Sequence, residues 1–354
     1  MEKTLRNVII VASLTLCTSC GGLNNLVSNG IAIANELLPG NEAAINQLGT
    51  IVSTGVAITG GNLSVKEEMP NQNGILMSQA NSRATNHDSI TWSYNILSRT
   101  LTIAGSGNMP NYTYDKQPWK QYNSVVKKII IGKGVTSIGE NAFSQCVGLT
   151  QVDFPSSLKT IGAHAFDNCS GLTTLSFPDG LTTIGADAFS CCNGLKSIVI
   201  PNSVTNLETE AFEKCQGLTS VIIGSGCKII AQEVFKECPN LTSVEILNGV
   251  EVIGGRDVFY GCKSLSSIII PSSVTEIGPG TFAGCKSLTH IDLPSSLQHI
   301  YSRTFRNSGL VSIRIPSSVK SIGEKAFEYC SGLMSITFTE GLTNIGEDAF
   351  SGCI

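Results

Sequence analysis

The stretch that decides the fold is Leu265-Ser-Ser-Ile268-Ile-Ile270-Pro271-Ser-Ser-Val274-Thr-Glu-Ile277-Gly278-Pro-Gly-Thr-Phe282-Ala-Gly-Cys285-Lys-Ser287. Leu288 then begins the same pattern again. The phenylalanine of this unit recurs at intervals of 22 to 24 residues, at Phe143, Phe166, Phe189, Phe212, Phe235, Phe259, Phe282, Phe305, Phe327 and Phe350. A period in the twenties that holds over ten units predicts a solenoid, in which each unit forms one coil of a stack.

Each unit begins with Leu-x-x-Ile/Val-x-Ile/Phe/Leu, which places three apolar side chains on one side and polar positions on the other. This is the strand signature of leucine-rich repeats. A proline often follows and ends the strand (Pro155, Pro178, Pro201, Pro271, Pro294 and Pro316). The next motif is Val/Leu-x-x-Ile-Gly, and we expect its glycine, as at Gly139 and Gly323, to adopt a positive φ in a turn.

An Ala-Phe pair or its variant follows, as at Ala165-Phe166 and Val258-Phe259, and we expect it on a short helical or 3₁₀ turn. The fold class expected is therefore a β-rich leucine-rich-repeat solenoid of about ten coils, each of 22–24 residues, preceded by a small β cap. Since a single coil cannot bury its own apolar face, the coils must share one long core.

A cysteine stands three residues after nearly every phenylalanine of the repeat, at Cys146, Cys169, Cys192, Cys215, Cys238, Cys262, Cys285, Cys330 and Cys353. Only the Phe305 unit has Ser308 there instead. A buried column of thiols that behave as small hydrophobes is the interpretation we favour. No Cys-x-x-Cys or His/Cys cluster suits zinc, so we expect no metal site. Disulfides between neighbouring coils stay open as an alternative in an oxidising compartment.

The composition is that of a globular protein, with 42% hydrophobic and 14% charged residues. The net charge of −4 speaks against nucleic acid as a partner. The four histidines accompany no nucleophile motif, and the chain has no phosphate-binding loop. We therefore expect no enzyme and no cofactor.

Residues 1–19 have the pattern of a lipoprotein signal peptide, with Lys3 and Arg6 before an apolar core that is too short to span a bilayer. We expect Cys20 to be the lipidated first residue of the mature chain, and the lipid to be the protein's only attachment to a membrane. Cys17, three residues earlier, departs from the leucine usual there. An ordinary secretory signal peptide is the alternative.

Residues 20–88 are predicted to form a tether that is weakly helical or disordered, and residues 89–124 a β-rich cap at the start of the repeats of residues 125–354. Trp92 and Trp119 lie in this cap, and we expect their rings to cover the open end of the core. A sugar-binding site at both tryptophans is the alternative. The last unit stops at Cys353-Ile354 without a cap, so we expect either that the chain is a fragment or that this end docks onto another molecule.

The succession of strand, proline, Val-Thr-x-Ile-Gly, Ala-Phe and cysteine resembles the BspA-type leucine-rich repeat of bacterial surface proteins. The resemblance covers about residues 89–354. It implies an exported protein of the outer membrane or cell surface, which adheres to host cells, host matrix proteins or other bacteria, and it carries no catalytic motif. A glycan- or peptide-capturing uptake lipoprotein and an assembly protein are the alternative functions.

Two columns of side chains should point outward from the strands. The first is mainly serine, whereas the second contains apolar residues where water is expected. Exposed apolar groups rimmed by polar ones favour a surface that binds a protein or glycan, and scattered surface variation is the competing explanation. The candidate ligand-binding residues are Val199, Ile222, Glu245, Ile269, His290, Asp292 and Arg314.

Overall fold

The computed structural model describes residues 58–59, 62–63, 77–79 and 90–353. The chain divides into two compact units, one of residues 1–80 and 93–100, the other of residues 81–92 and 101–354. In the first, β1 (Ile58–Thr59) pairs antiparallel with β2 (Asn62–Leu63), and β3 (Met77–Gln79) pairs antiparallel with β4 (Thr91–Asn95). The predicted signal peptide, Cys20 and most of the predicted tether lie outside the described residues.

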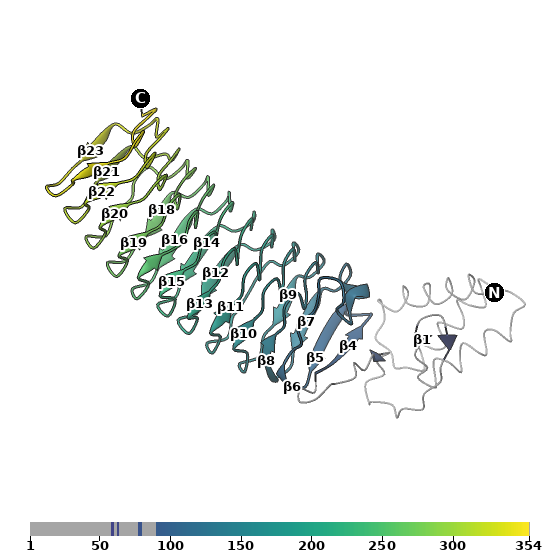
Figure 1. The fold of residues 1–354 in the computed structure, drawn as a ribbon. Coiled ribbons are helices and arrows are strands. Elements are labelled where there is room, and N and C mark those ends of the chain that lie inside the picture. The colour runs from purple at the N-terminus through teal and green to yellow at the C-terminus, as the bar shows by residue number, and fades with distance from the viewer. Residues whose placement is uncertain (1–57, 60–61, 64–76, 80–89, 354) are drawn as a thin grey trace, which may run out of the picture. The chain divides into compact units, whose positions relative to one another are not determined.

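The second unit is the predicted solenoid, and the fold class is confirmed. Its coils stack along one axis, and most of them contribute two short strands that pair in parallel with those of neighbouring coils (Figure 1). The Val-x-x-Ile motif forms one run of strands, in which Thr160 pairs with Thr183 of the next coil. This run comprises β6 (Ser106–Asn108), β8 (Gly134–Ile138), β10 (Thr160–Ile161), β11 (Thr183–Ile184), β13 (Asn206–Leu207), β15 (Ile229–Ile230), β17 (Val252–Ile253), β19 (Glu276–Ile277), β20 (His299–Ile300), β22 (Ser321–Ile322) and β24 (Asn344–Ile345).

The Leu-x-x-Ile/Val motif forms the second run of strands, which is divided into three sheets. Alternate residues point into the core, as the burial of Ile198 and Ile200 on β12 shows. The run comprises β5 (Thr100–Ala104), β7 (Lys128–Ile131), β9 (Gln151–Asp153), β12 (Ser197–Ile200), β14 (Ser220–Ile223), β16 (Ser243–Ile246), β18 (Ser267–Ile269), β21 (Ser312–Arg314) and β23 (Ser335–Thr337). In the described chain, no strand forms over residues 173–177 or 289–293, and the sheets end there.

A column of stacked phenylalanine rings runs through the core from Phe143 to Phe350. Neighbouring rings are nearly parallel, with interplanar angles of 3° to 28° and centroids 5.2 to 5.8 Å apart. Trp119 extends this column by one place, because its ring stacks on Phe143 at 5.3 Å. Such ring pairs add about 0.5–1.5 kcal/mol each beyond the area that they bury.

The segment that carries each phenylalanine is a turn, and the prediction of a helical or 3₁₀ conformation is wrong. In every coil, the residues two before and two after the phenylalanine have φ between 53° and 75°. The only 3₁₀ helix in the described chain is η1 (Lys120–Tyr122), which precedes the repeats. Alternation of right- and left-handed residues lets the Phe143 N–H donate to the carbonyl of Ala165 in the next coil, at 2.8 Å. The turns therefore stack by hydrogen bonds between coils.

The glycine of the Ile-Gly motif does not adopt a positive φ, and that prediction is also wrong. A Cβ atom at Gly278 would stand 2.0 Å from the carbonyl oxygen of Gly255 in the preceding coil. At Gly139 it would stand 1.9 Å from the oxygen of Pro110. At these positions a side chain would collide with the backbone of the preceding coil, whereas three other coils have Glu208, Ala231 and Tyr301 in place of the glycine.

The described cysteines are all free, and those of the repeat form the predicted column of buried thiols. From Cys169 onward, each thiol donates to the carbonyl oxygen of the phenylalanine in the preceding coil, as Cys262 does to Phe235 at 3.2 Å. Burial raises the pKa of the Cys169 thiol well above its usual value. Since the thiolate is the reactive form, these cysteines are inert parts of the core.

Candidate functional site

The candidate ligand-binding residues fall into two groups. The parallel register of β12, β14, β16 and β18 places Val199 beside Ile222, Ile222 beside Glu245, and Glu245 beside Ile269. These four residues, which we call the outward ladder, form one row across four coils. They come from strand positions that point away from the core, because the residues on either side of each are the ones that face the phenylalanine column.

The outward ladder exposes apolar surface in the middle of a polar face. Val199 is 57% exposed and Ile269 is 59% exposed, although both are large aliphatic side chains. Ile222 is half-buried between them, and Glu245 provides one exposed carboxylate. The serines of the neighbouring column, Ser197, Ser220, Ser243 and Ser267, follow the same register and form a row of hydroxyl groups along one side of the apolar row.

The other three candidates do not lie on this sheet. His290 and Asp292 belong to the segment that forms no strand, and the His290 Nε2 lies 3.2 Å from Asp292 Oδ1. Both side chains are well exposed. Arg314 is exposed on β21, which pairs only with β23 in the described structure. The structure therefore unites four of the seven residues in one row and leaves the other three beyond a break in the sheet.

Trp92 and Trp119 are buried, with exposed fractions of 5% and 1%. Their rings meet edge to face at 6.0 Å, and Trp119 Nε1 donates to the carbonyl of Ala142 at 2.8 Å. Tyr112 also packs edge to face on Trp119. A sugar that stacks on a tryptophan needs an accessible ring face, and these rings cover the end of the phenylalanine column instead.

The outward ladder lies apart from two hollows of the described surface, which have volumes of about 600 and 680 Å³. The first lies around Asn206, Glu208 and Ile229, the second around Phe154 and Phe177. None of the seven candidate residues lines either hollow. Since small-molecule sites are usually enclosed, a ladder outside both hollows suits a macromolecule better than a small ligand.

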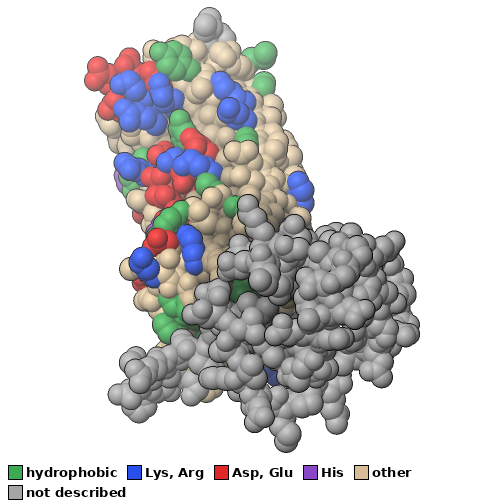
Figure 2. All heavy atoms as spheres, turned by 90° about the vertical axis from the view of Figure 1, so that its right-hand side faces the viewer, with side chains coloured by type: hydrophobic (Ala, Val, Ile, Leu, Met, Phe, Trp, Pro, Cys, Tyr) green, Lys and Arg blue, Asp and Glu red, His purple; other side chains and the backbone are tan. Residues whose placement is uncertain are grey.

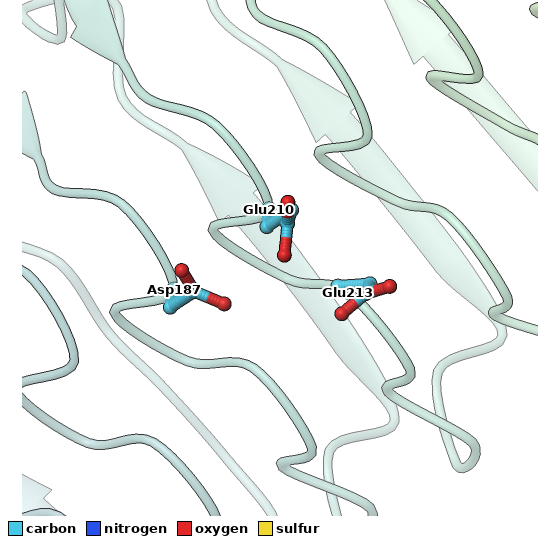
Figure 3. Close-up of side chains that lie close together, drawn as sticks. All are labelled: Asp187, Glu210 and Glu213. Carbon is cyan, nitrogen blue, oxygen red and sulfur yellow. The ribbon is translucent and has the colours of Figure 1, made fainter.

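A cluster of three carboxylates on the phenylalanine turns was not foreseen from the sequence (Figure 3). Oxygen atoms of Asp187, Glu210 and Glu213 all lie within 4.8 Å of one another. Burial raises the pKa values of Asp187 and Glu210, and repulsion among the three carboxylates raises them further. These are the residues of the described chain that could together hold a cation through oxygen ligands, the kind that calcium prefers.

Lysines already compensate the most buried of these carboxylates. Glu213 is 5% exposed, and its Oε1 lies 3.0 Å from Lys214 Nζ and 3.5 Å from Lys236 Nζ. Lys236 also contacts Glu233 at 2.6 Å, and Arg256 contacts Glu233 at 3.2 Å. Burial alone would raise the pKa of Glu233, but these two cations hold it below its usual value. The cluster thus continues into an ion-pair network along the turns.

The sequence contained a signal for this cluster. Asp187 and Glu210 each stand two residues before a column phenylalanine, and Glu213 stands one residue after. Positions that recur once per coil become neighbours in a solenoid, so acids in phase along the repeat must meet.

No helix among the described residues is long and apolar enough to cross a membrane. The predicted lipidation site Cys20 lies outside the described residues. The attachment of the chain to a membrane therefore stays a prediction from the sequence.

Comparison with known proteins places these features in a family. The model of the BspA-type leucine-rich-repeat region matches residues 121–242 and 253–354. No curated protein matches the chain. A leucine-rich-repeat protein from Bacteroides ovatus is similar in structure, with 24% identity and a TM-score of 0.46, over 77% of this chain and 93% of that one.

Two further solved structures share the arrangement. A leucine-rich cell surface protein from Faecalibacterium prausnitzii is 26% identical, with a TM-score of 0.38, over 77% of this chain and 94% of that one. The pneumococcal vaccine antigen PcpA is 16% identical, with a TM-score of 0.43, over 78% of this chain and 86% of that one. Since the family model covers well over half of the sequence, this chain belongs to the BspA-type leucine-rich-repeat family.

Proposed function

We propose that the protein is a cell-surface binding protein, an adhesin, which presents the outward ladder to a protein on a host cell, in the host matrix or on another bacterium. The observation that carries the proposal is the row of Val199, Ile222, Glu245 and Ile269 on adjacent strands. Solenoids characteristically bind partners across such extended sheet faces. One of the similar solved structures is that of a leucine-rich cell surface protein, which supports a role in contact with other cells.

The exposed side chains of the outward ladder and of the serine column beside it favour a protein partner. Two strongly exposed aliphatic side chains lose contact with water when a partner covers them, and each contributes about 1.5–3 kcal/mol when fully buried. The serine column and Glu245 form a polar rim that can pair with backbone and side-chain groups. The buried tryptophans remove the feature that favoured a glycan site in the cap.

The proposal is tested by binding of the purified protein to immobilised matrix proteins and to a glycan array. The variant carries Ile222→Ser and Ile269→Ser together. We expect saturable binding of the parent protein to a matrix protein and a loss of at least about tenfold in affinity for the variant, which corresponds to about 1.4 kcal/mol. Unchanged binding by the variant would remove the ladder from the interface.

Ile229→Ser is a matched control, because Ile229 is 56% exposed but lies on β15, in the other run of strands. It removes similar apolar area and should leave binding intact. Equal losses with the control and with the ladder variant would indicate a general effect on the fold. Binding only to glycans would favour the nutrient-capture alternative.

We also propose that Cys20 carries a lipid that holds the protein at the outer membrane. The support is the charged start, short apolar core and small residue before Cys20 in the sequence. Metabolic labelling with a fatty-acid analogue should label the parent protein and not a Cys20→Ala variant. Equal labelling of both would exclude this anchor.

An assembly role has one observation in its favour. Phe338 and Ile345 in the last described coil are 47% and 51% exposed, whereas Ile315 and Ile322, one coil earlier, are almost fully buried. This apolar surface can accept one further layer of side chains, from a further coil or from another molecule. If Phe338→Ser with Ile345→Ser leaves the mass in solution and the binding of other chains unchanged, this role is excluded.

A further inference from the structure

The turns that carry the phenylalanine column form a ridge along the solenoid. We call it the turn ridge and define it as the residues from two before to four after each column phenylalanine. Figure 2 shows that Lys, Arg, Asp and Glu side chains gather toward one side of the molecule, with few on the surface beside them. The turn ridge itself carries many charges, among them Asp167, Asp187, Glu210, Glu213, Lys214, Glu233, Lys236, Lys286, Arg303, Arg306, Lys325 and Glu328.

The charges of the turn ridge are sorted by sign. In the coils of Phe166, Phe189 and Phe212, the ridge has four carboxylates and, apart from His164, only one basic residue, Lys214. In the coils of Phe282 and Phe305, it has Lys286, Arg303 and Arg306 and no acid. We call these the acidic stretch and the cationic stretch. The first is shown in part in Figure 3.

The acidic stretch has more carboxylates than cations, because its one lysine, Lys214, already pairs with Glu213 at 3.0 Å. Among the described groups, only the His164 ring pairs with Asp187, at 3.9 Å. Burial raises the pKa values of Asp167 and Asp187. Repulsion from Asp187 raises the pKa of Asp167 further, and repulsion from Glu213 does the same to the pKa of Asp187. An arriving cation would relieve this repulsion.

The cationic stretch has charge available for a partner. Lys286 and Arg303 are exposed, and neither forms an ion pair with a described carboxylate. Arg306, by contrast, is already paired with Glu328. In the Phe282 coil, the ridge positions before Lys286 include Gly280 and Gly284, which carry no side chain that would keep another molecule from the backbone.

A partner that matches both stretches must repeat its charges at the spacing of the coils. Successive rings of the column are 5.2 to 5.8 Å apart, and the ridge charges recur with that pitch. In an extended peptide, the side chains on one face are about 6.6–6.8 Å apart, because they come from every second residue. This spacing exceeds that of the ridge charges, so the two sets of charges fall out of alignment within a few positions. A second copy of the same solenoid has the same pitch.

We propose that two copies of this chain associate side by side and antiparallel along their turn ridges, with the acidic stretch of each copy against the cationic stretch of the other. In this arrangement, the coil of Phe189 of one copy lies opposite the coil of Phe305 of its partner. The contact is two-fold symmetric, so each charge pair forms twice and the assembly closes as a dimer.

The association is electrostatic and therefore has a distinctive response to conditions. At about 1 M salt, the Debye length falls to about 3 Å, and the dimer separates. Protonation of the carboxylates at acid pH removes one half of each pair, so the dimer also separates there. Association through apolar surface, such as that around Phe338 and Ile345, would not weaken with salt.

The test measures the mass of the full-length protein in solution by light scattering, at low and at high salt. Variant A carries Asp187→Lys and Glu210→Lys, and variant B carries Lys286→Glu and Arg303→Glu. We expect the parent to be a dimer at low salt and each variant to be a monomer. A mixture of A and B should form a one-to-one dimer, because both contacts are complementary again.

A control variant with Lys196→Glu and Lys320→Glu makes the same change in net charge as variant B, at exposed sites away from the ridge. It should remain a dimer. Circular dichroism of all variants establishes that they are folded. A parent that is monomeric at low salt, a dimer that survives in A or B, a mixture that stays monomeric, or loss of the dimer in the control each overturns the proposal. So does a dimer that requires a divalent cation but not Lys286 and Arg303.

Discussion

The inside of each coil is nearly the same from one coil to the next, whereas the outside changes. Phenylalanine fills the column position in every coil from Phe143 to Phe350, and those from Phe143 to Phe327 are fully buried. The outward ladder runs from Val199 through Ile222 and Glu245 to Ile269 without a shared residue type beyond its two isoleucines.

The difference follows from what each position touches. An interior side chain meets the same side chain of two neighbouring coils, so a change at one coil must fit both. An outward side chain meets solvent or a partner and is free to vary. Interior positions thus determine whether coils stack, and outward positions determine what the stack can bind. Substitutions on the two sides should separate these effects.

The largest effect is expected for Phe235→Ala, which opens a cavity between Phe212 and Phe259. A buried phenylalanine replaced by alanine costs about 3–5 kcal/mol. Denaturant unfolding, followed by circular dichroism, should show this loss. Ile269→Ala, on the outward ladder two coils further along, should change stability by no more than about 0.5 kcal/mol. Similar losses for both variants would refute the division between inside and outside.

The next effect is expected for Gly278→Ala, because the added methyl would collide with the backbone oxygen of Gly255. Forcing an extra carbon into packed structure costs about 1–3 kcal/mol. Gly332→Ala is the matched control, since its Cβ would stand 3.6 Å from the oxygen of Leu310, an ordinary contact. The two variants should differ in denaturation midpoint. A Gly278→Ala protein as stable as the parent would show that adjacent coils can move apart at little cost.

A smaller effect is expected for Cys262→Ala, which removes the S–H donor to the buried carbonyl of Phe235. An unsatisfied buried acceptor costs about 1–3 kcal/mol, and a thiol is a weak donor, so the loss should lie at the low end. Cys262→Ser keeps a donor and should retain more of the stability. Adding a reductant to the parent should change nothing, because the described thiols are free. A large loss on reduction would instead show disulfides.

The core of this fold could be predicted from the sequence, because the residues that form it recur at the same position in each repeat unit. Phenylalanine, cysteine and the strand motif each repeat once per coil and indicate one shared core. The role of the Ile-Gly glycine was misjudged because close approach between coils depends on three-dimensional stacking. A positive φ can be expected from residue type, whereas the distance from Gly278 to the oxygen of Gly255 cannot.

The surface could be predicted only in part. The register that unites Val199 to Ile269 follows from the period, but the break in the sheet at residues 289–293 does not, since His290 and Asp292 stand at regular positions of the repeat. The carboxylate cluster could have been found by aligning the units, because Asp187 and Glu210 occupy the same position. Its raised pKa values could not, since they depend on burial and on the placement of Lys214 and Lys236.

The smallest effects on stability are expected on the turn ridge, where the carboxylates of Asp187 and Glu233 should respond to pH in opposite directions. Burial, with repulsion from Glu213, raises the pKa of Asp187 in the folded protein, although His164 partly offsets this. The folded state then holds a proton that the unfolded state releases, so ionised Asp187 opposes folding as pH rises above the unfolded value of about 3.9. Asp187→Asn should therefore stabilise the protein at neutral pH and have no such effect at acid pH.

Glu233 behaves in the reverse way, because Lys236 and Arg256 hold its pKa below the unfolded value despite burial. Its ion pairs stabilise the fold above that unfolded value, about 4.3, and the contribution disappears as the pH falls through the lowered folded pKa. Glu233→Gln should therefore destabilise the protein at neutral pH and be neutral in acid. Thermal unfolding of both variants across this range measures the two signs. If both curves shift in the same direction, net charge and not local pairing governs the ridge, which would also weaken the case for specific charge pairs between two copies.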